Sequence, residues 1–87
     1  MARRYSIVVA GTGYVGLVAG ACFAERGHSV VCVDTDADKV AEMAAGRSPI
    51  YEEGLEELMR RNIAEGRLSF TTDYTDAYRD AEAIFIG

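Results

Sequence analysis

The chain has 87 residues, of which 49% are hydrophobic and 26% are charged, and its net charge at pH 7 is −5. This length allows one small domain, and this composition is that of a globular protein. A negative chain without a basic cluster makes nucleic acid and anionic membranes poor partners, and no apolar run reaches the roughly 18 residues of a membrane span.

After a short polar lead at residues 1–4, the chain predicts a strand, a helix and a second strand. The apolar run Tyr5–Ala10 predicts the first strand, and Tyr14–Arg26 predicts the helix. Gly27 is the expected helix stop, because glycine adopts left-handed geometry easily. Ser29–Asp34 is expected to be a central parallel strand, since its Val-Val-Cys-Val run suits burial on both faces.

The turn between the first strand and the helix carries a glycine pattern, Gly11-Thr12-Gly13-Tyr14-Val15-Gly16. In a strand–turn–helix this pattern binds the pyrophosphate of a dinucleotide. Gly11 permits the sharp turn, Gly13 leaves room for the pyrophosphate, and Gly16 lets the helix lie close to the sheet. The free N–H groups and the positive dipole end of the helix then face the phosphates.

Asp34 ends the second strand about 20 residues after the glycines, where an acidic residue binds the adenosine ribose of the dinucleotide. Its carboxylate favours NAD over NADP, because a 2′-phosphate would bring two anions together. No arginine follows to offset that repulsion, and Lys39 is the one nearby cation. The alternative is that Asp34 only caps the turn into the next helix.

The second half of the chain predicts a helix capped by Asp36 and ended by Gly46, followed by a loop at Ser48–Tyr51. The apolar face of this helix is expected to hold Val40, Met43 and Ala44. The remaining predicted elements are a helix at Glu52–Glu65, a strand at Leu68–Thr71, a small helix capped by Thr72 or Asp73 that runs through Arg79, and a buried strand at Ala83–Ile86.

Together these elements predict an α/β fold, a Rossmann-type doubly wound parallel sheet that is truncated after about four strands. A full dinucleotide-binding fold of this type has six strands. We therefore interpret residues 1–87 as the N-terminal part of a longer protein.

The single histidine and the two cysteines predict no site. His28 lies in a turn with nothing nearby to activate it, so we expect a structural role. Cys22 and Cys32 lack the spacing of metal ligands and are expected to be core residues in a reducing cytoplasm. The sequence thus predicts neither a metal site nor a catalytic residue.

Three segments resemble the UDP-glucose/GDP-mannose dehydrogenase family, and they cover essentially the whole chain. They read GTGYVGLVAGACFAERGHSVVCVDTDADKV, GRSPIYEEGLEELMRRNIAEGRLSFTTD and DAEAIFIG. The second segment distinguishes this family from other NAD-binding proteins, because many NAD-binding folds share the first segment. One departure is Glu53, where the family usually has proline before the glycine. Glutamate there loosens the loop and leaves the cofactor site untouched.

The resemblance implies that residues 1–87 are an N-terminal NAD-binding domain and that the catalytic and substrate-binding residues lie beyond residue 87. The parent enzyme would oxidise the C6 alcohol of a nucleotide sugar to a carboxylate with two NAD. It would be a cytoplasmic homo-oligomer of polysaccharide biosynthesis. Tyr51 favours UDP-glucose, which gives UDP-glucuronate, while GDP-mannose and UDP-N-acetylmannosamine stay open.

Cofactor contacts follow from the matching motif positions. The backbone from Gly11 through Gly16, which includes Thr12, Gly13 and Tyr14, would contact NAD. The resemblance also places Val15 near the pyrophosphate, Asp34 on the adenosine ribose and Lys39 near the same ribose. Cys22 and Cys32 match neither the position nor the context of the family's catalytic thiol.

Three other interpretations stay open on the sequence alone. The first is an NAD-sensing regulatory module of the kind that gates potassium transporters, although such domains lack room for the SPIYEEGLEELMRRN segment. The second is a hydroxyacyl or phosphogluconate type dehydrogenase, which shares the first unit but not that segment. The third is a structural fragment without activity in isolation.

Overall fold

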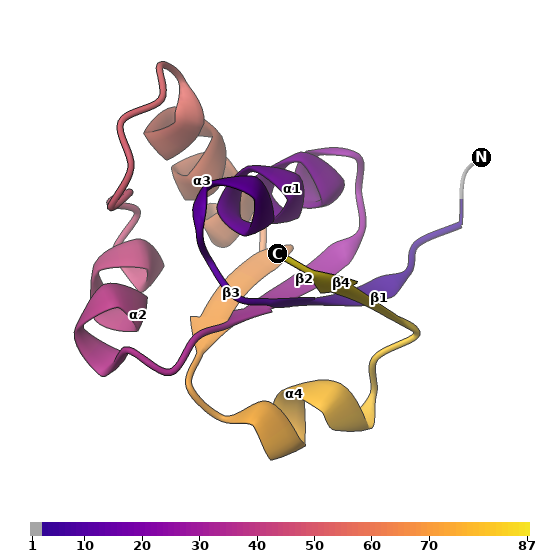
Figure 1. The fold of residues 1–87 in the computed structure, drawn as a ribbon. Coiled ribbons are helices and arrows are strands. Elements are labelled where there is room, and N and C mark those ends of the chain that lie inside the picture. Colours follow the sequence, from indigo (N-terminus) through magenta and orange to yellow (C-terminus); the bar gives the residue numbers. More distant parts are fainter. Residues whose placement is uncertain (1–2) are drawn as a thin grey trace.

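The computed structural model describes residues 3–87, so part of the polar lead at residues 1–4 lies outside the described range. Strands and helices alternate along most of this range (Figure 1). In chain order the elements are β1 (Ser6–Ala10), α1 (Tyr14–Glu25), β2 (Ser29–Val33), α2 (Ala37–Ala44), α3 (Leu55–Ala64), β3 (Leu68–Thr71), α4 (Tyr74–Arg79) and β4 (Ala83–Ile86).

The four strands form one parallel sheet in the order β3-β2-β1-β4. In the register of this sheet Val9 of β1 lies opposite Cys32 of β2 on one side and Phe85 of β4 on the other. This order matches the first four strands of the doubly wound fold, in which the chain moves outward from β1 and then crosses back. The Rossmann-type α/β prediction is confirmed.

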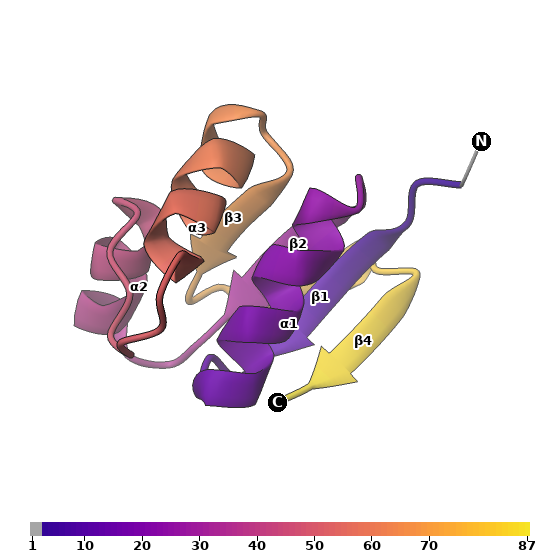
Figure 2. The same ribbon diagram turned by 90° about the horizontal axis from the view of Figure 1, so that it is seen from above.

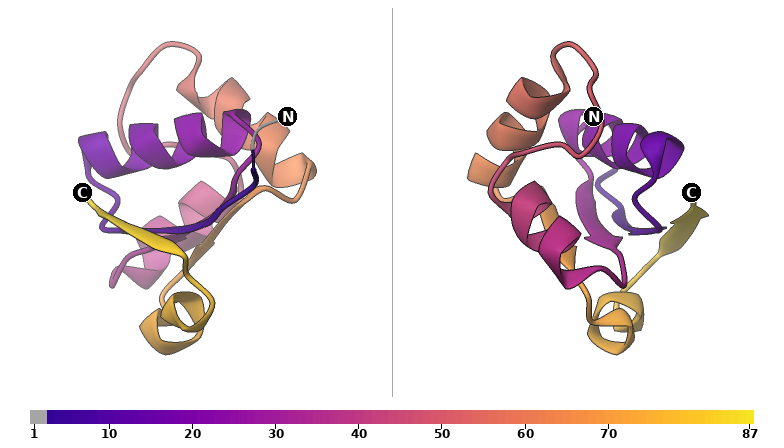
Figure 3. Two further views of the ribbon diagram at one scale, coloured as in Figure 1. Left: turned by 90° about the vertical axis from the view of Figure 1, so that its right-hand side faces the viewer. Right: turned by 60° about the vertical axis from the view of Figure 1, so that its left-hand side comes forward.

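The helices lie on both faces of the sheet. Helices α1 and α3 cover one face, α4 lies below the other, and α2 packs beside β3 (Figures 1 and 3). The core fills the space under α1 and α3, where apolar side chains of the strands meet those of the helices. Its fully or almost fully buried members include Val9, Leu17, Ala21, Val30, Cys32, Met43, Leu55, Met59 and Leu68.

The central and edge strands differ in burial. Ile7, Val8 and Val9 of β1 are all buried, as expected of a parallel strand covered on both faces. The strand predicted at Ala83–Ile86 is confirmed, but its predicted burial is wrong, because Ile84 is 52% exposed and Ile86 is 81% exposed. Since β4 pairs only with β1, it forms an edge of the sheet.

Helix boundaries confirm most of the predicted caps. The Asp36 side chain accepts hydrogen bonds from the backbone N–H groups of Asp38 and Lys39 at the start of α2. Of the two candidates for α4, Asp73 is the cap, and it accepts from the N–H of Asp76. Each carboxylate thus satisfies helix donors that have no acceptor within the helix.

Three expectations are corrected. Helix α3 begins at Leu55, not at Glu52, because Gly54 has a φ of +82° and cannot belong to a right-handed helix. Cys22 is exposed on the outer side of α1, so only Cys32 is a core residue. Ala44, the last residue of α2, is also exposed, whereas Met43 beside it is buried.

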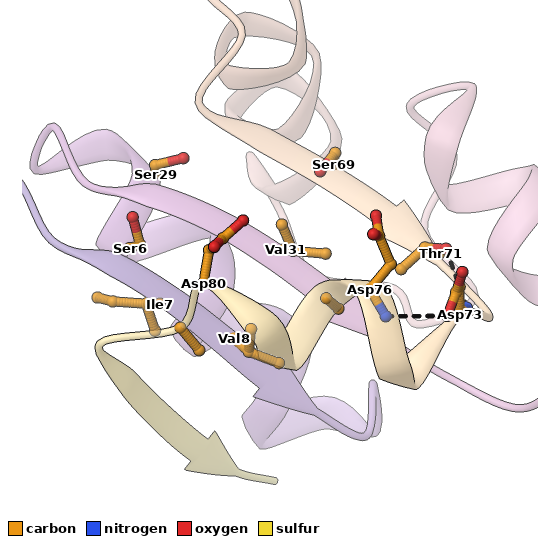
Figure 4. A pocket seen from close by; sticks show the side chains of 12 residues that line it. Ser6, Ile7, Val8, Ser29, Val31, Ser69, Thr71, Asp73, Asp76 and Asp80 are labelled. Carbon is orange, nitrogen blue, oxygen red and sulfur yellow. Dashed lines mark hydrogen bonds between the residues drawn. The ribbon is translucent and has the colours of Figure 1, made fainter.

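A hollow of about 340 Å³ lies between α4 and the sheet (Figure 4). Serine side chains of the strands (Ser6, Ser29 and Ser69) and aspartates of the α4 region (Asp73, Asp76 and Asp80) contribute to its lining. No residue of the six-residue helix α4 is buried, so this helix does not pack tightly on the sheet. None of the candidate cofactor residues lines this hollow.

Candidate functional site

The glycine-rich turn lies where the strands end and α1 begins, at one end of the sheet (Figure 2). Gly11 has a φ of +95°, which favours glycine, and its N–H donates to the carbonyl oxygen of Val33 at 2.9 Å. A Cβ atom at Gly16 would overlap the carbonyl oxygen of Gly11. One turn later, a Cβ at Gly20 would lie 2.8 Å from the sulfur of Cys32. The predicted close contact of α1 with the sheet is therefore present.

The start of α1 is open to its surroundings. Gly13 is the N-cap residue in extended geometry, and a Cβ at this position would meet no atom within 4 Å. Tyr14 is 50% exposed and Val15 is 61% exposed. The first N–H groups of a helix have no acceptor within the helix, and they carry its positive dipole end. These features fit the pyrophosphate of a dinucleotide, which needs close backbone approach and N–H donors.

The Asp34 carboxylate lies beside this turn, directly after β2. Its Oδ2 accepts from the N–H of Thr12 at 3.2 Å, from the Thr12 hydroxyl at 2.5 Å and from the ammonium of Lys39 at 3.3 Å. Its Oδ1 accepts from the N–H of Asp36 at 3.0 Å. The site therefore brings together the turn, the end of β2 and the first turn of α2.

These donors lower the pKa of Asp34 from its usual 3.8 to about 2. The hydrogen bond from the Thr12 side chain contributes most, followed on the lowering side by the Asp36 N–H, the Lys39 ammonium and the Thr12 N–H. Partial burial opposes them, because it disfavours the charged form. Asp34 is therefore an anion at neutral pH, and an ionised carboxylate accepts hydrogen bonds through both oxygens.

A second contact ties the turn to the loop between α2 and α3. The Tyr14 hydroxyl donates to the Glu52 carboxylate at 3.2 Å. This hydrogen bond, and then the negative charge of Glu52, raise the pKa of Tyr14 above its usual 10.0. Earlier in the same loop, the Ser48 N–H donates to Glu56 of α3 at 2.8 Å. Tyr51 is 92% exposed in this loop.

All eight predicted site residues lie at this end of the molecule. The geometry adds two contacts that the sequence analysis did not predict, namely the Thr12 side chain on Asp34 and the Tyr14 hydroxyl on Glu52. A signal for the first contact exists in the sequence, because the residues that follow two neighbouring parallel strands meet at one edge.

In the part of the chain that the structure describes, no group of three or more His, Cys, Asp and Glu side chains could hold a metal ion. Nor does any helix among residues 3–87 have the length and apolar character to cross a membrane.

Comparison with known proteins shows the family of this chain. The profile of the UDP-glucose/GDP-mannose dehydrogenase family, NAD binding domain, matches residues 5–87. The chain belongs to this family. It is a nucleotide-sugar dehydrogenase NAD-binding domain, and its cofactor is NAD.

Relatives within the UDP-glucose/GDP-mannose dehydrogenase family include enzymes for both sugars. A UDP-glucose 6-dehydrogenase of Bacillus subtilis is 57% identical over 81 residues, which are 93% of this chain and 18% of the relative. A GDP-mannose 6-dehydrogenase of Pseudomonas syringae is 45% identical over 83 residues, again 93% of this chain and 19% of the relative. The chain thus spans about a fifth of the length of these relatives.

Solved structures of the family share the fold closely. A GDP-mannose dehydrogenase of Pseudomonas aeruginosa, solved as a ternary complex, has a TM-score of 0.91 and 43% identity, and the match covers 94% of this chain and 19% of that one. A UDP-glucose dehydrogenase of Pyrobaculum islandicum has a TM-score of 0.92 and 42% identity, with 98% and 20% covered.

Proposed function

We propose that this chain is the N-terminal NAD-binding portion of a UDP-glucose 6-dehydrogenase, which oxidises the C6 alcohol of UDP-glucose to UDP-glucuronate with two NAD. The observation that carries the proposal is the open start of α1 at Gly13 beside the ionised carboxylate of Asp34. The higher identity to a UDP-glucose enzyme than to a GDP-mannose enzyme supports the choice of sugar.

In this proposal the backbone from Gly11 to Gly16 binds the pyrophosphate at the first turn of α1, with Val15 beside it. Asp34 accepts hydrogen bonds from the adenosine ribose, and Lys39 lies near the same ribose. Held there, NAD would supply the hydride acceptor for oxidation of the sugar. The catalytic and sugar-binding residues lie beyond residue 87, so residues 1–87 bind the cofactor and turn over no substrate by themselves.

A GDP-mannose 6-dehydrogenase is the second candidate, and the 45% identity to such an enzyme favours it. A UDP-N-acetylmannosamine dehydrogenase is supported less, at 27% identity to a solved structure from Staphylococcus aureus. The rate of NADH formation by the full-length protein with each of the three nucleotide sugars separates these candidates, and UDP-glucose is the expected substrate.

A cytoplasmic location and a homo-oligomeric parent enzyme belong to the same proposal. The two free cysteines support a reducing compartment. The oligomer rests on the family resemblance. Sedimentation of the full-length protein tests it.

The cofactor proposal is tested by titrating NAD and NADP into the full-length protein and its Asp34→Ala variant. We expect the unmutated protein to prefer NAD. The variant should bind NAD more weakly by roughly tenfold or more, because charge-assisted hydrogen bonds contribute about 1.5–3 kcal/mol. The preference over NADP should shrink, since the repulsion of the 2′-phosphate is removed.

Asp80→Ala is the matched control, because it removes an exposed carboxylate at the far side of the sheet. It should leave both affinities unchanged. Equal affinity of the unmutated protein for NAD and NADP would overturn the assignment of Asp34 to the ribose.

A further inference from the structure

Thr12 is a buried polar residue in an exposed turn. It is 1% exposed, whereas its neighbours Gly13 and Tyr14 are exposed. Its side chain therefore points into the protein and away from the open side of the turn. The hydroxyl of a threonine in this position does not face a cofactor. Because it is buried, it needs a hydrogen-bond partner within the protein.

The hydroxyl of Thr12 donates its hydrogen bond to Asp34. Both the backbone N–H and the hydroxyl of Thr12 donate to the same carboxylate oxygen, Oδ2, and the ammonium of Lys39 donates to it as well. Oδ1 accepts from the N–H of Asp36. The two oxygens of a carboxylate offer about four acceptor positions in total. Oδ2 is thus fully used, and the remaining acceptor capacity lies on Oδ1.

We propose that Thr12 is a positioning residue for cofactor choice: it fixes Oδ2 of Asp34 so that Oδ1 faces the adenosine ribose of NAD. This inference rests on the proposed NAD-binding function. A fixed carboxylate presents one oxygen to a ribose hydroxyl and cannot rotate away from a 2′-phosphate. Thr12 would therefore strengthen NAD binding and NADP rejection together.

The ribose has a second hydroxyl, and Oδ2 can accept from it when Lys39 gives up its hydrogen bond. Its ammonium is the partner of Oδ2 that can leave most easily, because it sits at the end of a flexible side chain that is 27% exposed. Thr12, by contrast, is buried and donates to Oδ2 from both its backbone N–H and its hydroxyl. When the ribose arrives, Lys39 can move aside while Thr12 keeps the carboxylate in place.

The test is a double-mutant cycle on NAD affinity in the full-length protein, with Thr12→Val, Asp34→Ala and the double variant. Valine keeps the shape of threonine and removes the hydroxyl. We expect Thr12→Val to weaken NAD binding by several-fold, up to about tenfold, because the released carboxylate must be ordered again when the ribose binds. In the Asp34→Ala background the same change should have no further effect, because groups that act through one another are not additive.

Three further readouts separate positioning from a merely structural role. Thr12→Ser should restore the affinity, since serine keeps the hydroxyl. The ratio of NAD to NADP affinity should fall in Thr12→Val, whereas a loss of folded protein would lower both affinities in proportion. Thr75→Val, the same change at an exposed position of α4, should leave the ratio unchanged.

The outcomes distinguish the inference from the function on which it rests. If the unmutated protein binds no NAD, both fail. If NAD binding depends on Asp34 while Thr12→Val binds like the unmutated protein, or if the two changes are additive, only the inference fails. Should Thr12→Val not fold, the structure of the NAD complex decides: a ribose hydroxyl on Oδ2 in place of Thr12 contradicts the proposal, and one on Oδ1 supports it.

Discussion

At the scale of single residues, the Asp34 carboxylate is held by four hydrogen bonds before any ligand arrives. Its side chain is only 14% exposed, so these bonds replace most of its water contacts. A carboxylate fixed in this way loses little freedom when it binds a ribose. Preorganisation of this kind raises affinity by lowering the entropy cost of binding.

The same bonds predict how stability depends on pH. The pKa of Asp34 falls from 3.8 to about 2 on folding, so the folded state binds its proton less tightly than the unfolded state. The resulting stabilisation, on the order of 2 kcal/mol, is complete above pH ~4 and is lost as the pH falls towards ~2. Asp34→Asn cannot titrate. The free energy of unfolding of the unmutated protein and of Asp34→Asn can be measured with denaturant between about pH 2 and about pH 7. The difference between the two free energies should shrink below pH ~4. A difference that stays constant across this range would contradict the pKa shift.

The turn could be predicted from sequence because each of its glycines is required locally. Gly11 needs a left-handed φ, and Gly16 lies against the carbonyl oxygen of Gly11 a few residues away. The role of the Thr12 side chain could not be predicted in the same way. It depends on β1 and β2 being neighbours in register, a tertiary fact that brings together residues 22 positions apart.

At the scale of elements, different glycines of the turn and of α1 serve packing against the sheet and binding of a ligand. Gly16 and Gly20 face the strands, where a side chain would collide with Gly11 or with Cys32. Gly13 faces open space in the same turn. Gly16 and Gly20 therefore serve packing, and Gly13 leaves space for a ligand.

Alanine substitutions should reveal this division. Gly16→Ala should destabilise the protein by roughly 1–3 kcal/mol or more, because a methyl group is forced into close-packed backbone. Gly13→Ala should change the free energy of unfolding by at most about 1 kcal/mol, since its φ of −68° suits alanine. It should nevertheless weaken NAD binding, because the methyl group fills the space where the pyrophosphate approaches. Thermal unfolding and NAD titration of both variants check this, and equal loss of stability in the two would contradict it.

The boundary of α3 shows where prediction at this scale fails. The apolar pattern from Leu55 to Ile63 predicts the helix correctly, because its buried side is set by the period of the helix. The same pattern cannot locate the first turn. Gly54 decides it by adopting φ +82°, and the loop before it is held by Glu52 and Glu56 through contacts to Tyr14 and Ser48.

At the scale of the whole molecule, the two sides of the sheet are covered unequally. One face is packed under α1 and α3, and the other has the short α4 and the hollow beneath it (Figures 3 and 4). The sheet also has an open edge at β4, where Ile84 and Ile86 are exposed. The apolar sequence of β4 predicts a strand, but its burial depends on what lies next to it.

An exposed apolar edge strand can pair with the edge of another molecule, because its outward N–H and C=O groups are unpaired. We therefore expect a protein that consists of residues 1–87 alone to self-associate through β4. Ile86→Lys should reduce the association, since charges at an edge oppose strand pairing. Tyr51→Lys is the matched control, because it places the same charge at another exposed side chain, in a loop away from the edge. Sedimentation velocity of the three proteins checks the expectation. A monomer at all concentrations, or equal effects of the two lysines, would show that β4 is not the associating surface.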